Sequence, residues 1–199
     1  MHIEGEAVYI DLNDERHSIE GVGSFSDNTA LKSLKVSGEL TFKEITCDEL
    51  KIEGEGSGTS AITKNFSVSG SIEIDSVEVE EIFKVSGSTE IKKLNAKKII
   101  MESRDGSIGE IKCDEIRIYH EEIPRTTLLS NIFRPNKSRV RIGRIDGGKV
   151  ELENCEVEEI NCHDAFIRAN CVIKKLVFDG ECEIDDINSQ VAELIDKNS

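Results

Sequence analysis

A short motif ending in glycine recurs along the first half of the chain at steps of 16 or 17 residues. Each copy is a β-branched residue, a Ser or Glu, and then one of Gly5, Gly21, Gly38, Gly54, Gly70 and Gly87. Two further steps reach Met101-Glu102-Ser103 and Ile118-Tyr119-His120, where the apolar residue persists and the glycine does not. A fixed period of this length indicates a repeat protein, in which each unit buries its apolar residues against its neighbours.

The residues between two successive glycines indicate strands rather than helices. Apolar and polar residues alternate in three pairs between Gly38 and Gly54, and two polar residues separate each pair from the next. The pairs are Leu40 with Phe42, Ile45 with Cys47, and Leu50 with Ile52. Alternation with period two is typical of β-strands. We therefore predict an all-β fold, a single-stranded, three-faced parallel β-helix (β-solenoid) with rungs of 16–17 residues.

One slot in each repeat is filled by a small or narrow residue. It is the third position of a string that recurs in recognisable copies, for example at 45–52, 94–101 and 111–118. The residues that fill it are Cys47, Val79, Ala96, Cys113, Gly147 and Cys162. Because parallel strands stack about 4.8 Å apart, we expect these residues to form one interior ladder beside a tight corner. Each rung buries its faces only against its neighbours, so residues 1–199 are predicted to form a single domain.

The charge of the chain limits its partners and location. It carries 40 acidic and 25 basic residues, for a net charge of −15. Nucleic acids and anionic membranes are poor partners for such a surface, so we expect neither for the body of the protein. The sequence starts with polar residues, and no apolar stretch reaches the length of a membrane span. These features predict a cytoplasmic protein whose contact with the membrane surface is either weak or absent.

Six cysteines raise the question of a metal site or of disulfides. No C-x-x-C pair is present, and the spacing follows the repeat, since 16 residues separate Cys155 from Cys171. Cys162 and His163 are neighbours on a predicted strand, so their side chains should point to opposite faces and share no ligand. The cysteines are predicted to be buried small hydrophobic residues, and we expect neither a metal nor a cofactor.

The 16–17-residue repeat is interrupted between residues 121 and 138, the segment that contains both prolines of the chain. No acidic residue occurs between Ile123 and Ile145, which reverses the local charge of an acidic protein. We predict an inserted loop over 121–138 whose apolar residues form one face of one or two helical turns. The loop either lies back on the rod or, as part of a segment 123–145, docks an acidic protein partner. The candidate partner-binding residues are Arg125, Leu128, Leu129, Ile132, Phe133, Arg134, Arg139 and Arg141.

The C-terminal repeats are similar to those of the bactofilins, the polymer-forming bacterial cytoskeletal proteins. Residues 147–153 read Gly-Gly-Lys-Val-Glu-Leu-Glu, and two C-x-I pairs follow at Cys171 and Cys182, closer together than one rung. With the glycine-spaced repeats, this pattern most resembles the long variant found in Gram-positive bacteria. The resemblance implies a right-handed coil, no nucleotide, no catalysis, and end-to-end stacking into filaments. Many members bind the membrane through a short N-terminal segment, whereas this sequence begins in register with its repeats.

The ends of the rod decide whether copies can stack, because an uncovered end exposes unpaired backbone groups and a cut core. Residues 189–196 are predicted to form a short C-terminal capping helix, with Ser189 as its N-cap and Val191, Leu194 and Ile195 as its apolar face. No cap is evident at the N-terminus. The candidate end-rung residues for self-association are Val8, Ile10, Ile19 and Val22.

The leading hypothesis for function is a non-enzymatic, bactofilin-like structural or scaffold protein that forms homo-oligomers through the ends of its β-helix. The alternative is a capped, monomeric or dimeric β-helix that docks an acidic partner through residues 123–145. An enzyme is not expected. Hexapeptide acyltransferases also use a β-helix, but they keep a strict six-residue repeat and a catalytic histidine. Here the four histidines share no common pattern, and no paired carboxylates, nucleophile elbow or phosphate loop occurs.

Overall fold

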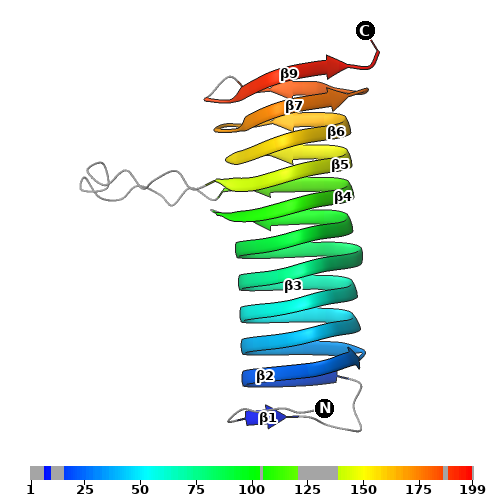
Figure 1. Cartoon of the computed structure of the whole chain (residues 1–199), viewed down its shortest axis with the longest axis vertical. Helices are drawn as coiled ribbons and strands as arrows, with labels where there is room; N and C mark the ends of the chain where they lie inside the picture. The colour runs from blue at the N-terminus through cyan, green and yellow to red at the C-terminus, as the bar shows by residue number, and fades with distance from the viewer. Residues whose placement is uncertain (1–6, 10–15, 104, 121–138, 186–187, 199) are drawn as a thin grey trace, which may run out of the picture.

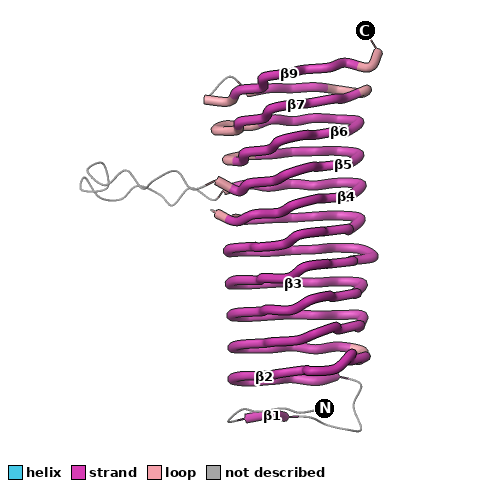
Figure 2. The backbone as a smooth tube through the Cα atoms, viewed as in Figure 1, coloured by secondary structure: helices cyan, strands magenta, loops and turns pink. Residues whose placement is uncertain are grey.

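The computed structural model describes residues 7–9, 16–103, 105–120, 139–185 and 188–198. This part of the chain contains strands and no helix (Figures 1 and 2). The strands are β1 (Ala7–Tyr9), β2 (Arg16–Ala30), β3 (Ser33–Glu102), β4 (Gly106–Tyr119), β5 (Val140–Leu152), β6 (Cys155–Ile167), β7 (Val172–Phe178), β8 (Cys182–Ile184) and β9 (Gln190–Asp196).

The strands wind into a parallel β-solenoid of about nine turns. β3 alone runs for 70 residues through several turns, so pairing with the neighbouring turns continues around the corners (Figure 1). The hydrogen-bonded order is β1-β2-β3-β4-β5-β6-β7-β9, and β8 pairs with β6. The pairings between these strands are parallel, apart from that of β1 with β2. The predicted all-β parallel solenoid is therefore confirmed.

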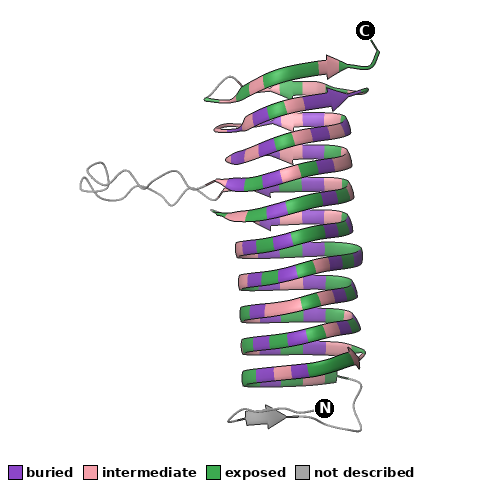
Figure 3. Cartoon of the chain, in the orientation of Figure 1, coloured by how far each residue is buried: buried purple, intermediate pink, exposed green. Residues whose placement is uncertain are grey.

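The core is a stack of apolar side chains inside the coil, and buried and exposed residues alternate along every turn of β3 (Figure 3). The three alternating pairs predicted between Gly38 and Gly54 are all buried. Like residues stack on like from turn to turn. One such column runs through Leu94, Ile111, Ile145 and Ile160. Each turn is therefore stabilised mainly by apolar contact with the turns above and below it.

The recurring glycine lies at a corner where successive turns touch backbone to backbone. Gly54 has a φ of 135°, which residues with a side chain rarely adopt. A Cβ there would overlap the carbonyl oxygen of Gly38 on the preceding turn. Further along, Ser103 takes this place and donates a hydrogen bond of 2.6 Å to the carbonyl of Gly87. Later still the corner is made by Asn154, with a φ of 57°. Asparagine tolerates left-handed backbone better than most residues that carry a side chain.

The capping helix predicted over 189–196 is wrong. Residues Gln190–Asp196 form β9, which pairs in parallel with β7 and adds a further turn to the rod. Val191 and Leu194 each lie in register with a core residue of β7. Their spacing of three suits one face of a helix, but it is also the spacing of two core residues on either side of one corner of this coil, like Ile173 and Leu176. The stacking surface offered by β7 decides between the two structures in favour of a strand.

Ser189, predicted as the N-cap of that helix, instead joins the last two turns. Its hydroxyl donates to the carbonyl of Arg168 at 2.6 Å and accepts from the N–H of Cys171 at 3.1 Å. Both backbone groups belong to the turn below. The hydroxyl therefore satisfies polar groups at a corner where the parallel ladder is interrupted.

The N-terminal turn also differs from the prediction of a parallel first rung. Residues 7–9 form β1, which runs antiparallel to β2 and places Val8 opposite Ile19. An antiparallel strand cannot continue the in-register stack, so the repeat begins at β2. The first glycine motif, which ends at Gly5, and the candidate Ile10 lie outside the described residues.

Candidate interaction surfaces

Among the described residues, no group of three or more His, Cys, Asp or Glu side chains could hold a metal ion. No helix in the same part of the chain is long and apolar enough to cross a membrane. The polar groups instead form long columns on the outside of the rod, one residue from each turn. The interaction surfaces of this protein are therefore its ends and its faces.

The basic segment predicted over 123–145 is only partly described. Residues 121–138, predicted as a loop, lie outside the described residues, and with them the candidates Arg125, Leu128, Leu129, Ile132, Phe133 and Arg134. From Val140 the chain belongs to β5, a regular turn of the rod whose Ile142 and Ile145 are buried in the core. The second half of the segment is therefore part of the solenoid wall and not of a loop.

The described arginines of this segment face acidic residues of the same rod. The guanidinium of Arg144 lies 2.9 Å from Asp146 and 3.4 Å from Glu159 on the next turn. Arg141 approaches Glu156 at 4.0 Å. Arg139, with Arg141, lines one end of a groove of about 570 Å³ whose other charged residues are acidic. Much of the local positive charge is thus balanced within the chain, which weakens the case for docking an acidic partner here.

The C-terminal end of the rod is formed by β9, an edge strand. One side of β9 pairs with β7, and no other described strand pairs with its opposite side. Leu194 continues a core column but is 51% exposed, because no described residue covers it from beyond the last turn. This end therefore combines a row of unpaired backbone groups with an exposed section of the core.

The candidates at the N-terminal end do not converge on one surface. Ile19 is buried in the core, whereas Val22 is 48% exposed and lies in register with Glu39 on the outside of the rod. Val8 lies on β1, which covers a short stretch of the β2 edge at residues 18–20. The two ends thus differ, because an antiparallel strand covers part of one and the other ends in a parallel edge.

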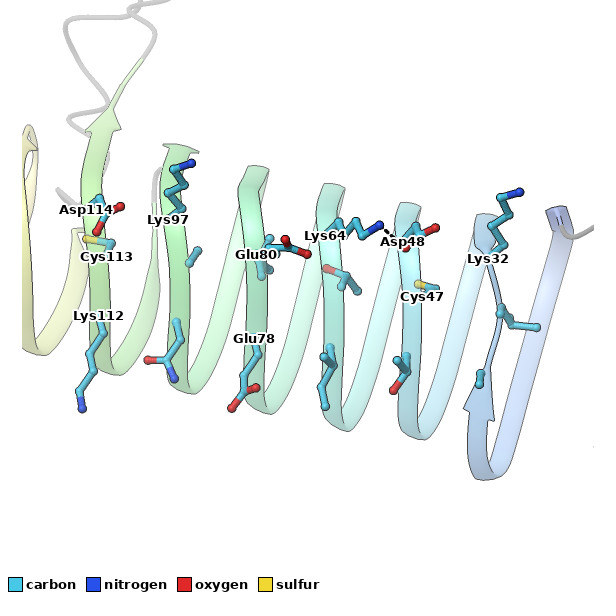
Figure 4. Close-up of a pocket in the computed structure, with 18 of the residues that line it drawn as sticks. Lys32, Cys47, Asp48, Lys64, Glu78, Glu80, Lys97, Lys112, Cys113 and Asp114 are labelled. Atoms are coloured by element: carbon cyan, nitrogen blue, oxygen red, sulfur yellow. Dashed lines mark ion pairs between the residues drawn. The ribbon is translucent and has the colours of Figure 1, made fainter.

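A groove of about 1780 Å³ runs along one face of the rod and crosses several turns (Figure 4). Six turns each contribute three consecutive residues, and in five of them the middle residue is small or narrow, the exception being Leu31. These middle residues form the floor, and they include Cys47, Thr63, Val79, Ala96 and Cys113. The predicted ladder of narrow residues is present, since Ala96, Cys113, Gly147 and Cys162 pair in turn. The small side chains of this ladder pack in the core wall and leave a hollow between two rows of outward-pointing side chains.

One rim of this groove carries charges of alternating sign, a column that we call the charged ridge. From the N-terminal side the ridge consists of Lys32, Asp48, Lys64, Glu80, Lys97 and Asp114, one from each turn (Figure 4). Lys64 Nζ lies 3.0 Å from Asp48, and the pKa of Lys64 is raised chiefly by its hydrogen bond to that carboxylate. The opposite rim carries no such alternation and includes Ile62, which is 48% exposed.

A second column on another face alternates in the same way. It runs through Lys93, Glu110, Arg144, Glu159, Lys175 and Glu193, each in register with the next. Parallel in-register stacking brings residues 15 to 18 apart into contact, so equal charges at that spacing would repel one another on neighbouring turns. The charges of the surface, predicted from composition to be mainly acidic, thus alternate in sign along defined columns. Reading charge at the repeat spacing would have found the charged ridge in the sequence, and the second column apart from its step from Glu110 to Arg144, which crosses residues 121–138.

The cysteines are free, and most are buried, as the repeat spacing predicted. Burial raises the pKa of the Cys47 and Cys162 thiols to about 12, with a smaller contribution from nearby acidic side chains. Cys155 and Cys171 are fully buried on adjacent turns. A hydrogen bond to Cys171, together with burial, raises the pKa of the Cys155 thiol well above its ordinary value. The thiols of Cys47, Cys155 and Cys162 are therefore poor nucleophiles, which favours a packing role.

Comparison of the chain with protein-family models, with curated proteins and with solved structures gives no match. The proposed function therefore rests on the solenoid shape and on the surfaces described above.

Proposed function

We propose that this protein is a non-enzymatic structural or scaffold protein that self-associates through the ends of its β-solenoid, as bactofilins do. The observation that carries the proposal is the C-terminal end. β9 offers an unpaired strand edge, and Leu194 exposes half of its surface at the end of a core column. Exposed strand edges with apolar neighbours pair readily with other chains. The proposal includes the right-handed, three-faced cross-section that the resemblance implies.

The absence of any described metal-binding cluster is compatible with this role but does not carry it. What supports a scaffold is the regularity of the wall: a long rod with charged columns at fixed spacing presents a surface that repeats along its length. End-to-end contact would extend that surface without a change in conformation. An assembly of this kind needs no nucleotide, because the free energy comes from covering the cut core and pairing the edge.

The test is sedimentation velocity across a concentration series, with negative-stain microscopy of the same samples. The natural chain should form end-to-end species, and these should increase with added salt because repulsion between chains of charge −15 is then screened. Leu194→Lys, which puts a charge on the exposed core, should abolish them. The matched control is Gln190→Lys, which places the same charge on an exposed position of β9 outside the core column.

Two results would overturn the proposal. The first is a natural chain that remains monomeric at every concentration and salt concentration. The second is an assembly that persists unchanged in Leu194→Lys, since the contact would then lie elsewhere. An equal loss in Leu194→Lys and Gln190→Lys would contradict the assignment to the core column, because charge on β9 alone would then be sufficient.

A further inference from the structure

We propose that a second copy of this chain docks side by side and antiparallel on the long groove, so that the charged ridges of the two copies pair. This contact is separate from the end-to-end contact proposed above. It is carried by the order of charges on the ridge, by the hollow beside the ridge and by the apolar residue exposed on the opposite rim.

All six positions of the ridge meet an opposite charge in one arrangement only, with the two copies antiparallel and at the same height. Read from the N-terminal side, its six positions alternate from basic to acidic, beginning with Lys32 and ending with Asp114. When one copy is turned end over end, every position meets the opposite sign. Lys32 then faces Asp114 of the other copy, Asp48 faces Lys97, and Lys64 faces Glu80. Two copies aligned in parallel at the same height would instead place Lys on Lys and acid on acid.

The symmetry of the contact follows from the same order. A two-fold axis between the turns of Lys64 and Glu80, perpendicular to the rod, relates the two copies. The interface is then isologous, with each residue contributing twice, and it closes at a dimer. Alternating charge also stabilises each rod by itself, as the Asp48–Lys64 pair shows. The ridge also has an even number of positions and begins and ends on opposite signs. For this reason each residue meets an opposite charge when the second copy is antiparallel.

The hollow explains how the ridges come close. The floor of the groove is lined by small residues such as Cys47, Val79 and Ala96, and it lies directly beside the ridge. Because the two-fold axis sets ridge against ridge, the two grooves face each other beside the paired ridges, and the aliphatic stems of the lysines can cover their floors. Ile62, 48% exposed on the opposite rim near the two-fold axis, would be covered as well.

The size of the contact predicts its strength. Six turns span roughly 24 Å along the rod, at about 4.8 Å for each step between turns. A strip of that length buries an area near the lower limit for specific protein interfaces, about 1,000 Å² in total. Exposed ion pairs contribute little each, so the charges select the direction while the covered floor supplies affinity. We therefore expect a reversible dimer at micromolar concentration or weaker.

Zero-length carbodiimide cross-linking of the intact natural chain tests the direction without any substitution. Equal amounts of ¹⁵N-labelled and unlabelled protein are mixed, cross-linked and analysed by mass spectrometry. The expected products are Lys32–Asp114 and Asp48–Lys97 with mixed isotopes. Within one rod these pairs lie five and three turns apart, roughly 24 and 14 Å, so one rigid chain cannot form them. The absence of both, with only adjacent-turn products such as Asp48–Lys64, would overturn the proposal.

The same experiment in Leu194→Lys separates this contact from the end contact. The two cross-links should persist there, because β9 lies beyond the ridge. If they disappear together with the end-to-end species, the side contact depends on the ends and the proposal is wrong. If end-to-end assembly fails in the natural chain while the cross-links form, the proposed function fails and this inference stands.

A variant with the whole ridge reversed gives a second test at unchanged net charge. It carries K32E, D48K, K64E, E80K, K97E and D114K, which exchange three lysines for three acids and keep the alternation within each rod. We expect each chain to dimerise with itself in the antiparallel arrangement, whereas an antiparallel mixed pair would place like charges together at all six positions.

Isotope-labelled natural chain, cross-linked in an excess of either protein, reports the arrangement. In an excess of the natural chain, carbodiimide should give the mixed-isotope Lys32–Asp114 product. In an excess of the reversed chain, D114K would set an amine against Lys32, so a short amine-reactive reagent replaces carbodiimide there. It should give no product that joins position 32 of one chain to position 114 of the other, and such a product would overturn the charge register.

Discussion

The carboxylate of Asp179 lies 2.7 Å from Nδ1 of His163 on the preceding turn, at the exposed surface of the rod. The hydrogen bond to Asp179, with the nearby charge of Asp164, raises the pKa of His163 above its ordinary value. The same hydrogen bond lowers the pKa of Asp179. A pair of opposite charges at the repeat spacing thus links the last turns, in the manner of the charged ridge further down.

This pair predicts a specific pH dependence. Because the folded pKa of His163 is raised, its contribution to stability is fully present below the unfolded value, near 6.5, and is lost as pH rises through the folded value. The folded pKa of Asp179 is lowered, so its contribution to stability is lost in the opposite direction, as pH falls through that value. NMR titration should show that Asp179→Asn lowers the pKa of His163. An unchanged pKa would exclude the direct contact. Asp75→Asn, a carboxylate removed on a distant turn, is the control.

The glycine corner predicts a difference between two identical substitutions. Gly21 and Gly54 both have positive φ, 101° and 135°, but only at Gly54 would a Cβ overlap backbone of the preceding turn. Gly21→Ala should therefore cost about 1–3 kcal/mol from backbone strain alone. Gly54→Ala should cost more, about 4 kcal/mol or above, because the turns must separate. Urea denaturation followed by circular dichroism measures both, and equal costs would show that packing at the corner adds nothing.

The period and the alternation were sufficient to predict the solenoid, since both are local properties of the sequence. Stacking in register then follows, because residues such as Leu94 and Ile111 recur at equal spacing and bury each other. The last turn could not be predicted in this way. The spacing of Val191 and Leu194 suits a helix as well as a strand, and only the stacking surface of β7 distinguishes the two.

The surfaces were harder to predict than the core. A charge of −15 suggests a uniformly acidic wall, whereas the charges alternate along defined columns. Lys64 and Glu80 are unremarkable in the linear sequence, and they acquire meaning only when the turn length aligns them. Likewise composition alone indicates one basic segment over 123–145, whereas Arg141 and Arg144 belong to β5, a regular strand that pairs with its neighbours.

Burial predicts slow reaction of the cysteines with alkylating reagents. The pKa of Cys47 and of Cys162 is raised to about 12, so roughly a thousand-fold less thiolate is present than for an ordinary thiol. In the native protein, iodoacetamide at neutral pH should modify the partly exposed Cys182 first, and slowly, because burial raises the pKa of the other partly exposed thiol, Cys113, to about 12 as well. Unfolding in urea should expose all six. Rapid native modification of Cys47 or Cys162, mapped by mass spectrometry, would contradict the packing.

Asn154 offers a test of why the glycine rhythm stops. Its φ of 57° is left-handed, and its backbone joins neighbouring turns through hydrogen bonds to Ala169 and Val140. If the backbone conformation is what this corner requires, Asn154→Gly should change the free energy of unfolding by less than about 0.5 kcal/mol. Asn154→Ala should then cost about 1–2 kcal/mol, because alanine lacks asparagine's tolerance of this region. Asn95→Ala, at an exposed strand position without positive φ, is the control and should be nearly neutral. Equal losses in the Gly and Ala variants would instead assign the role of Asn154 to its side chain.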